Sequence, residues 1–450
     1  MRTLSKIMFC ALGLSACNWT EFDDLKDTTS VSVIGKPSGS KSSDVGVALV
    51  RGQQTSGASE GGTFVTYGTN KPFMYRITVD AKGAEKYKSK VDLTELFGFS
   101  NIEASPTVIA NPITDDVALV TKTLADQIGV LENDTSDNVT NKQIFELANV
   151  NAAAYILTPG IVSGEMPGYR AIVAGSNSDA QSVLEREISS AEGDTPKCIL
   201  DDGATPRNPV AVRGIAGVMV SHAAETDPAK IYDDVVVWTT AGKLLVYDGR
   251  VIKGQVQNLT VNTDTTCPAD PVVPPMVPLT EGHSGPLAGR VLDTGFMPGL
   301  GSQLIRYKDH YVIAIGHKDT AADTASFIQV FDIAGTGAPT VVGTPVNTAG
   351  LKSAAVLTTS AGDFLVAGYP FTDADGKQNA GMLQVYGLSE TGVDATPMQS
   401  IAPPSPGTNN NFGRAVTAFS FNGEQTIVVG EVNNVYTYFT TALYSDAREK

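Results

Sequence analysis

The fold is indicated most clearly by the stretch GRAVTAFSFNGEQTIVVGEVNNVYTYF, residues 413–439. Its three apolar or aromatic runs are separated by glycine, asparagine and other polar residues, a pattern typical of β-strands joined by turns. Two further units, 301–333 and 350–388, share its plan: an initial glycine, an apolar strand, a second strand ending in glycine, and an aromatic strand. The unit starts at 301, 350 and 413 are therefore 49 and 63 residues apart.

A strand-rich unit that recurs at this spacing predicts an all-β protein, a β-propeller. A few short antiparallel strands bury only part of their surface, whereas blades set around an axis cover one another. A β-sandwich, the alternative for any single unit, would place seven to nine strands in about 100 residues without such a repeat. At roughly 57 residues per repeat we predict about seven blades, with six or eight as alternatives. Upstream, 61–80, 115–134 and 168–176 fit weaker copies of the unit.

Local patterns predict individual elements. The alternating segment 30–35 is expected to join the last blade and close the ring, because an open ring exposes a sheet edge at both ends. A hairpin is expected over 233–249, with its turn at Ala241-Gly242, and helical patterns occupy 142–153 and 182–189. A glycine ends the second strand of each unit, where we expect a tight turn or a positive φ. These glycines are Gly316, Gly368 and Gly430.

The segment 410–430 resembles an FG-GAP repeat, the blade unit of the integrin α-chain propeller. Phe412-Gly413 matches the FG pair, and Ile427–Gly430 matches the strand that ends in GAP. Val366–Pro370 resembles the GAP segment again in the second unit. We expect Phe412 to pack inward, with Gly413 and Gly430 at the bounds of adjacent antiparallel strands. The resemblance implies a propeller that binds a protein or a glycan.

Propellers of this family often bind calcium in acidic loops, which makes Asp373 and Asp375 weak calcium candidates. Calcium takes six to eight oxygen ligands, and these two carboxylates lack a third acid at the matching position. They also follow the GAP-like segment, which is not the loop that holds calcium in the family. A solvated Asp-Gly turn is the alternative, and we expect no cofactor.

The first 16 residues have the plan of a bacterial lipoprotein signal peptide. Arg2 and Lys6 precede an apolar run, 7–14, that is shorter than the roughly 20 residues needed to span a bilayer. The following Leu14–Cys17 resembles a lipobox, which implies cleavage before Cys17 and acylation of Cys17. An ordinary signal peptide that contains a cysteine, or a buried apolar strand, is the alternative. The next residue is Asn18, and an asparagine at this position resembles the sorting signal by which such lipoproteins are released to the outer membrane.

These features divide the chain into four parts. The signal peptide covers 1–16, and a lipidated, polar and flexible tether is expected over 17–43. The propeller is expected over 44–440 and a polar tail over 441–450. The predicted location is the cell envelope, with the lipid-anchored protein facing the periplasm or the cell surface.

Two cysteines remain once Cys10 leaves with the signal peptide and Cys17 carries lipid. A remaining pair in an exported protein suggests a disulfide, here between Cys198 and Cys267. Two free thiols are the alternative.

The charge balance excludes two classes of partner. The chain has 450 residues, with 32 Lys and Arg against 48 Asp and Glu, a formal charge of −16. Nucleic-acid binding needs a clustered basic surface, and a polybasic membrane contact needs the same, so neither is expected. Contact with the membrane is expected through the N-terminal lipid alone.

No catalytic constellation emerges from the sequence. Gly282–Pro286 begins like a GxSxG nucleophile elbow but has proline where the last glycine belongs. The proline-rich stretch 267–280 favours a stiff connection, a docking ligand being the alternative. No histidine has a partner at metal-binding spacing, and we expect all four to be polar surface residues. They are His222, His283, His310 and His317.

The predicted function is therefore a membrane-anchored, non-catalytic binding scaffold. An outer-membrane assembly factor is one alternative, although its repeats carry regular tryptophans and this chain has only Trp19 and Trp238. An envelope hydrolase or lyase on a propeller scaffold is another, and it requires titratable groups that converge on the axis.

Overall fold

A computed structural model describes the backbone of the strands given below and the side chains of part of the chain. The described side chains are those of residues 152–157, 200, 202, 210–219, 232–249, 286–318, 325–358, 362–418, 427–432 and 436. Within the described residues, no helix is long and apolar enough to span a membrane.

The described strands form seven sheets, and the first three begin in the N-terminal half of the chain. Sheet 1 contains β2 (Val45–Arg51), β3 (Glu60–Gly68), β4 (Phe73–Asp80) and β5 (Glu85–Asp92). Sheet 2 contains β6 (Thr107–Ala110), β7 (Val117–Lys122), β8 (Gln127–Asn133) and β9 (Val139–Glu146). Sheet 3 contains β10 (Val150–Thr158), β11 (Gly168–Gly175), β12 (Val183–Glu185), β13 (Cys198–Leu200) and β17 (Gly282–Ser284).

The other four sheets carry most of the described side chains. Sheet 4 contains β14 (Val212–Val218), β15 (Asp234–Thr239), β16 (Lys243–Tyr247) and β18 (Val291–Asp293). Sheet 5 contains β19 (Gln303–Tyr307), β20 (Tyr311–His317), β21 (Ala325–Asp332) and β22 (Thr340–Ala349). Sheet 6 contains β23 (Ser353–Thr359), β24 (Gly362–Tyr369), β25 (Met382–Ser389), β26 (Gly392–Val393) and β27 (Gln399–Ile401). Sheet 7 contains β28 (Ala415–Phe421), β29 (Glu424–Gly430), β30 (Asn434–Phe439) and β1 (Val31–Gly35).

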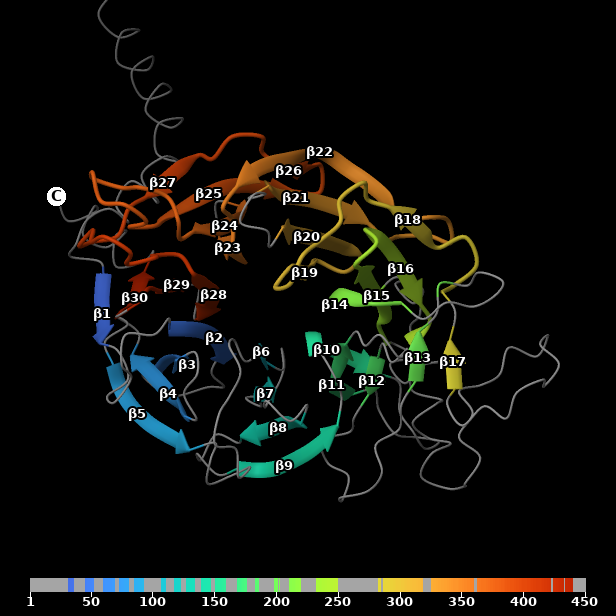
Figure 1. Ribbon diagram of the computed structural model, residues 1–450, viewed down its shortest axis with the longest axis horizontal. Helices are drawn as coiled ribbons and strands as arrows, with labels where there is room; N and C mark the ends of the chain where they lie inside the picture. Colours follow the sequence, from blue (N-terminus) through green and yellow to red (C-terminus); the bar gives the residue numbers. More distant parts are fainter. Residues whose placement is uncertain are drawn as a thin grey trace, which may run out of the picture.

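The sheets are arranged as a β-propeller, which confirms the predicted fold class (Figure 1). The first strand of each sheet lies innermost and contacts the first strand of the next, from β2 through β6, β10, β14, β19, β23 and β28 back to β2. The ring is therefore continuous. The number of blades stays a prediction, since the sheets are counted over the described strands alone.

Strands from both ends of the chain close the ring. β1 pairs antiparallel with β30, from Val31 opposite Tyr438 to Gly35 opposite Asn434. The predicted closing role of the segment 30–35 is confirmed. This strand lies inside the range 17–43 expected to be a tether, and it is the first of the described strands.

The two helical patterns are wrong. The pattern at 142–153 lies across the end of β9 and the start of β10, and the pattern at 182–189 contains β12. Pairing with β8 and β11 holds these residues in strands, because cross-strand contacts override a weak local preference. The hairpin at 233–249 is confirmed, with β15 paired to β16 and Gly242 in the turn at φ +79°.

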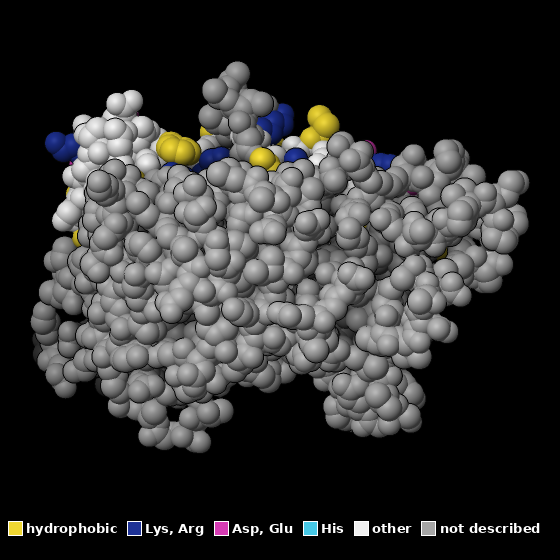
Figure 2. Space-filling model, turned by 60° about the horizontal axis from the view of Figure 1, so that its bottom comes forward, with side chains coloured by type: hydrophobic (Ala, Val, Ile, Leu, Met, Phe, Trp, Pro, Cys, Tyr) yellow, Lys and Arg dark blue, Asp and Glu magenta, His cyan; other side chains and the backbone are white. Residues whose placement is uncertain are grey.

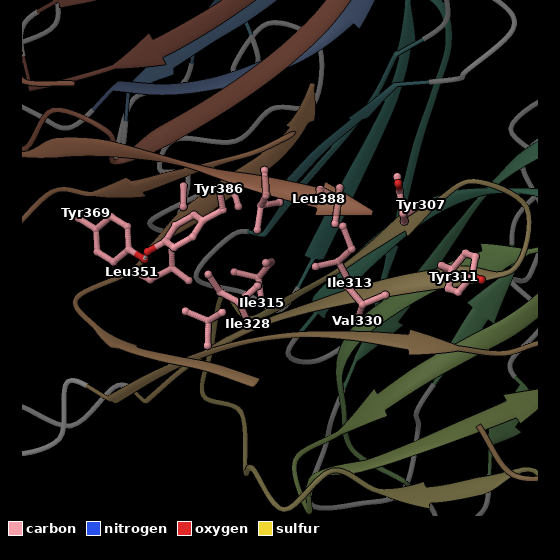
Figure 3. Close-up of a cluster of buried hydrophobic side chains, with 14 residues drawn as sticks. Tyr307, Tyr311, Ile313, Ile315, Ile328, Val330, Leu351, Tyr369, Tyr386 and Leu388 are labelled. Atoms are coloured by element: carbon pink, nitrogen blue, oxygen red, sulfur yellow. Dashed lines mark hydrogen bonds between the residues drawn. The ribbon is translucent and has the colours of Figure 1, made fainter. Parts of the chain in front are cut away.

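The core lies between neighbouring sheets. Between sheets 5 and 6, side chains of β20 and β21 pack against those of β24 and β25 (Figure 3). The Tyr369 and Tyr386 hydroxyl groups hydrogen-bond within this layer at 2.9 Å. Both faces of these strands are covered, and every residue of β20 is buried. Side chains of the aromatic third strand of each sequence unit therefore pack between neighbouring sheets.

The glycines that end the second strands have another role than the one expected. Gly316 and Gly368 lie inside β20 and β24, and none of Gly316, Gly368 and Gly430 is among the positive-φ residues of the described chain. A Cβ on Gly316 would lie 2.6 Å from atoms of both Phe296 and Trp238, and one on Gly368 would overlap the Gly413 carbonyl oxygen. Glycine is needed here because neighbouring elements approach the backbone closely.

Candidate binding faces of the propeller

The antiparallel order of the strands gives the propeller two faces. The loop face carries the connections β18–β19 (294–302), β24–β25 (370–381) and β27–β28 (402–414). The charged face carries β19–β20 (308–310) and β25–β26 (390–391). Contacts between sheets agree with this division: Ser353 Oγ donates to the Gly413 carbonyl on the loop face, and the Met219 amide donates to the Asp309 carbonyl on the charged face.

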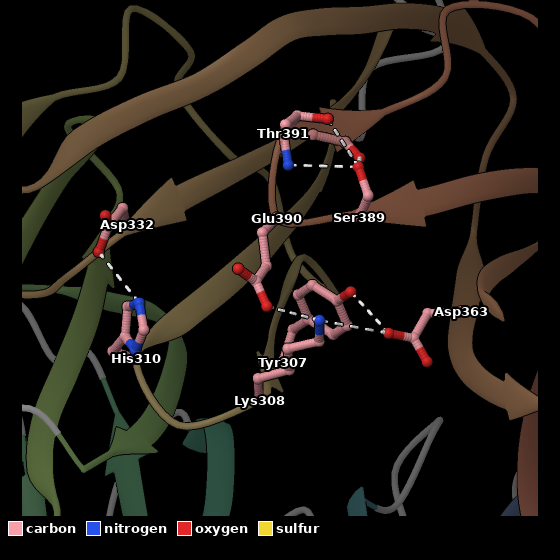
Figure 4. Close-up of polar contacts among 9 residues, drawn as sticks. Tyr307, Lys308, His310, Asp332, Asp363, Ser389, Glu390 and Thr391 are labelled. Carbon is pink, nitrogen blue, oxygen red and sulfur yellow. Dashed lines mark hydrogen bonds and ion pairs between the residues drawn. The ribbon is translucent and has the colours of Figure 1, made fainter. Parts of the chain in front are cut away.

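On the charged face, ionisable side chains of sheets 5 and 6 meet (Figure 4). Lys308 is held in the turn at φ +52°, and its Nζ lies 2.7 Å from Glu390 Oε1 and 3.8 Å from Asp363 Oδ2. The Tyr307 hydroxyl donates to Asp363 Oδ2 at 2.7 Å. Lys308 Nζ also lies 5.2 Å from the centre of the Tyr307 ring. These groups join β19 and its turn to β24 and the end of β25.

The protonation states on this face follow from those contacts. Burial, then the hydrogen bond with Asp363, raises the pKa of Tyr307 to about 12. The hydrogen bond with Glu390 raises the pKa of Lys308, and the same contact lowers the pKa of Glu390. Lys308 is therefore charged and Tyr307 neutral at neutral pH, and neither has the pKa of a base or nucleophile.

A buried ion pair joins three sheets on the same side of the ring. Asp233, directly before β15, is 0% exposed, and Arg306 Nη1 on β19 lies 3.1 and 3.2 Å from its two carboxylate oxygens. The Leu157 amide on β10 donates to Asp233 Oδ2 at 3.0 Å, and the Asp233 amide donates to the Leu157 carbonyl. Burial raises the pKa of Asp233 above its ordinary value, against the opposing effect of Arg306.

The loop face is built from ordered asparagine-rich turns. Asn379, Asn409 and Asn411 have positive φ values of 50°, 60° and 55°, a region that asparagine tolerates better than most residues. The amides of Asn409, Asn411 and Phe412 donate to the carbonyls of residues 378, 379 and 380. The connections 370–381 and 402–414 thus form one hydrogen-bonded unit.

Large apolar side chains are exposed on this face. Met297 is 65% exposed, Leu300 54% and Phe371 48%. Two contacts fix the segment that carries Met297 and Leu300. The Phe296 ring stacks on the Phe327 ring, with 4.9 Å between ring centres, and the Thr294 hydroxyl donates to the Gly242 carbonyl. Figure 2 shows hydrophobic side chains (yellow) projecting from the described part of the surface, close to Lys and Arg side chains (dark blue).

The calcium candidates have structural partners in a turn. Asp373 Oδ1 accepts the Asn379 amide at 2.8 Å. Asp375 and Gly376, both with positive φ, form the tip of a tight hairpin in which the amides and carbonyls of Ala374 and Lys377 pair. Across the described residues, no group of three or more His, Cys, Asp or Glu is placed to hold a metal ion.

The histidines divide between surface and core. His310 is partly exposed on the charged face, with Nε2 3.9 Å from Asp332 Oδ1. His317 is only 5% exposed, so its predicted surface position is wrong: it ends β20, and its amide donates to Ser302 Oγ. His222 lies outside the described residues, and His283 lies in β17 with its side chain outside them.

The predicted covalent sites are not tested by the structure. Cys17 and Cys267 lie outside the described residues. Cys198 lies in β13, but its side chain is outside them. Lipidation and the disulfide therefore stay predictions.

Phe412 lies where the sequence predicts it. The side chain is 0% exposed and meets Tyr436 edge-on at 5.7 Å between ring centres. Ala415 pairs with Gly430, so Gly430 ends its strand, and Gly413 lies two residues before the start of β28, at φ +85°. The ion pairs described above had no signal in the sequence, because their partners are 73 and 82 residues apart.

Comparisons with known proteins support the fold alone. No family model matches the chain, and no curated protein matches it in sequence. Among solved structures, the crystal structure of the Cps50 (Swd1) beta-propeller domain from Myceliophteria thermophila is similar, with a TM-score of 0.50 and 9% identity. The match covers 91% of this chain and 99% of that one. At this identity the likeness shows a β-propeller, and the FG-GAP resemblance stays a prediction.

Proposed function

We propose that this protein is a lipid-anchored lipoprotein of the bacterial cell envelope, whose propeller is a non-catalytic scaffold that binds a protein partner through its loop face. The observation that carries this proposal is the exposure of Met297, Leu300 and Phe371 on ordered connections. Interfaces between proteins are enriched in methionine and aromatic residues, and loops on a rigid scaffold are common binding elements. A protein partner is favoured over a glycan because two of the three side chains are aliphatic.

The charged face supports a non-catalytic role. Its Lys308, Glu390, Asp363 and Tyr307 are engaged with one another, and these contacts fasten sheet 5 to sheet 6. A general base or nucleophile needs a pKa suited to neutral pH and a free approach to substrate. The arrangement instead suits a structural junction.

Photo-crosslinking in intact cells tests the binding face. A photoreactive phenylalanine analogue is placed at position 300 or 371, and at 341 as a matched control, since Val341 on β22 is 51% exposed. We expect a discrete adduct of constant mass from 300 and 371 and none from 341. Equal adducts from all three positions, or none from any, would contradict the proposal.

The anchor is tested separately. Cys17→Ala is expected to abolish incorporation of labelled palmitate and to release the protein from membranes. Unchanged membrane association of this variant would overturn the proposed lipid anchor and leave the binding face intact.

A further inference from the structure

We infer that the anchored propeller turns its charged face toward the membrane and its loop face away from it, so that a partner reaches the loop face from the side opposite the lipid. The inference rests on the proposed lipidation of Cys17. It adds to that proposal the orientation of the molecule, which follows from where the chain enters the ring.

The entry point is β1, the outermost strand of sheet 7. Val31 lies opposite Tyr438 near the end of β30, whereas Gly35 lies opposite Asn434 at its start. β30 starts on the loop face, because β29 ends there at Gly430, which pairs with Ala415 directly after the connection 402–414. The Val31 end of β1 therefore lies at the charged face.

The length of the chain between Cys17 and β1 determines how strongly the position of Val31 sets which face lies nearer the membrane. Residues 18–30 separate Cys17 from Val31. A random-coil chain of 13 residues spans on average about 20 Å. Reaching the loop face instead would require it to run along the whole height of sheet 7, about 23 Å for a seven-residue strand, before it reached the lipid. The shorter route leaves the charged face nearer the membrane.

The charge of this face would not draw it onto the membrane. The described charged face carries five acidic residues, Asp233, Asp309, Asp332, Asp363 and Glu390, against Arg306 and Lys308, an excess of negative charge that anionic lipid headgroups would repel. This face is therefore held near the membrane by the tether and does not dock on it. The exposed apolar side chains stay accessible on the other face.

Energy transfer to the membrane tests the inference with the full-length lipidated protein. A fluorophore is attached through an unnatural amino acid at Thr391 on the charged face or at Gln378 on the loop face, two exposed positions of sheet 6. The protein is reconstituted in phosphatidylcholine vesicles with a headgroup-labelled acceptor lipid. Because the two sites lie about a strand length apart, roughly 25 Å, transfer from 391 should exceed transfer from 378 at least about twofold.

A longer tether provides the control. Insertion of a 30-residue Gly/Ser linker between Asp24 and Leu25 should bring the ratio of the two efficiencies close to one. Equal or reversed transfer in the lipidated parent protein would overturn the orientation while the proposed anchor stands. An unchanged ratio after insertion would also overturn it, because the tether would not be the cause. Absence of palmitate and of vesicle association would overturn both proposals.

Discussion

Two junctions of the ring are held together in different ways. Between sheets 6 and 7 the contact is apolar and close, with Phe412 buried and Gly368 against the Gly413 backbone. Where sheets 3, 4 and 5 meet, a buried ion pair of Asp233 and Arg306 is added to apolar packing. The residues of the first junction belong to the repeated sequence units. The ion pair of the second junction instead joins two charged residues from distant positions in the sequence. Similar sheets can thus be joined by apolar packing alone or by apolar packing with one specific polar contact added.

The largest expected effect is on the apolar junction. Phe412→Ala removes a fully buried aromatic side chain and should lower the free energy of unfolding by about 3–5 kcal/mol, measured by chemical denaturation. Phe371→Ala is the matched control, since this phenylalanine is 48% exposed, and should change stability little. Equal effects of the two substitutions would mean that Phe412 does not pack between the sheets.

The polar junction is broken by Arg306→Met, which leaves the Asp233 carboxylate buried without its cation. We expect a loss of about 3 kcal/mol at neutral pH, the lower end for a buried pair, because the Arg306 side chain is 30% exposed. Burial already raises the pKa of Asp233, and loss of Arg306 raises it further. Protonation then relieves the buried charge, so the deficit should shrink as the pH falls toward 4.

Denaturation of parent and variant across this pH range measures the effect. The double variant Arg306→Met, Asp233→Asn should regain part of the loss at neutral pH, because the buried charge is gone. A deficit that is the same at every pH would show that Arg306 acts through packing of its side chain and not through its charge.

Gly368→Ala sharpens the description of the apolar junction. The added Cβ would overlap the Gly413 carbonyl oxygen, so the sheets must move apart, at a cost of about 1–3 kcal/mol. Gly337→Ala is the control, because no atom lies within 4 Å of its added Cβ and its φ is not positive. A gain in stability for Gly368→Ala would show that the two backbones are not in close approach.

The smallest effect concerns the charged face. Tyr307 should ionise near pH 12, seen as the difference in phenolate absorbance between the parent and Tyr307→Phe. Since the folded-state pKa lies above the ordinary 10, its contribution to stability is complete below pH 10 and is lost as the pH rises through about 12. Asp363→Asn should lower this pKa. Ionisation near pH 10 in the parent protein would contradict the described contact.

The sequence by itself determined the strand units, the closure of the ring by residues from both ends of the chain, and the inward position of Phe412. These features depend on local alternation of apolar residues and on turn residues, which are read over a few neighbouring positions. The same reading was wrong for 142–153 and 182–189, where a helical pattern competes with pairing to another strand.

Only the tertiary structure decided which side chains meet between sheets. The partners of Arg306 and Lys308 lie in other sheets, and the burial of His317 depends on the segment that contains Ser302. Gly316 and Gly368 have ordinary strand conformations. Glycine is needed at these positions because Trp238, Phe296 and Gly413 of neighbouring elements leave no room for a side chain. The physical reason is that periodicity places a residue on a face of its own strand, whereas packing of the sheets around the axis decides what covers that face.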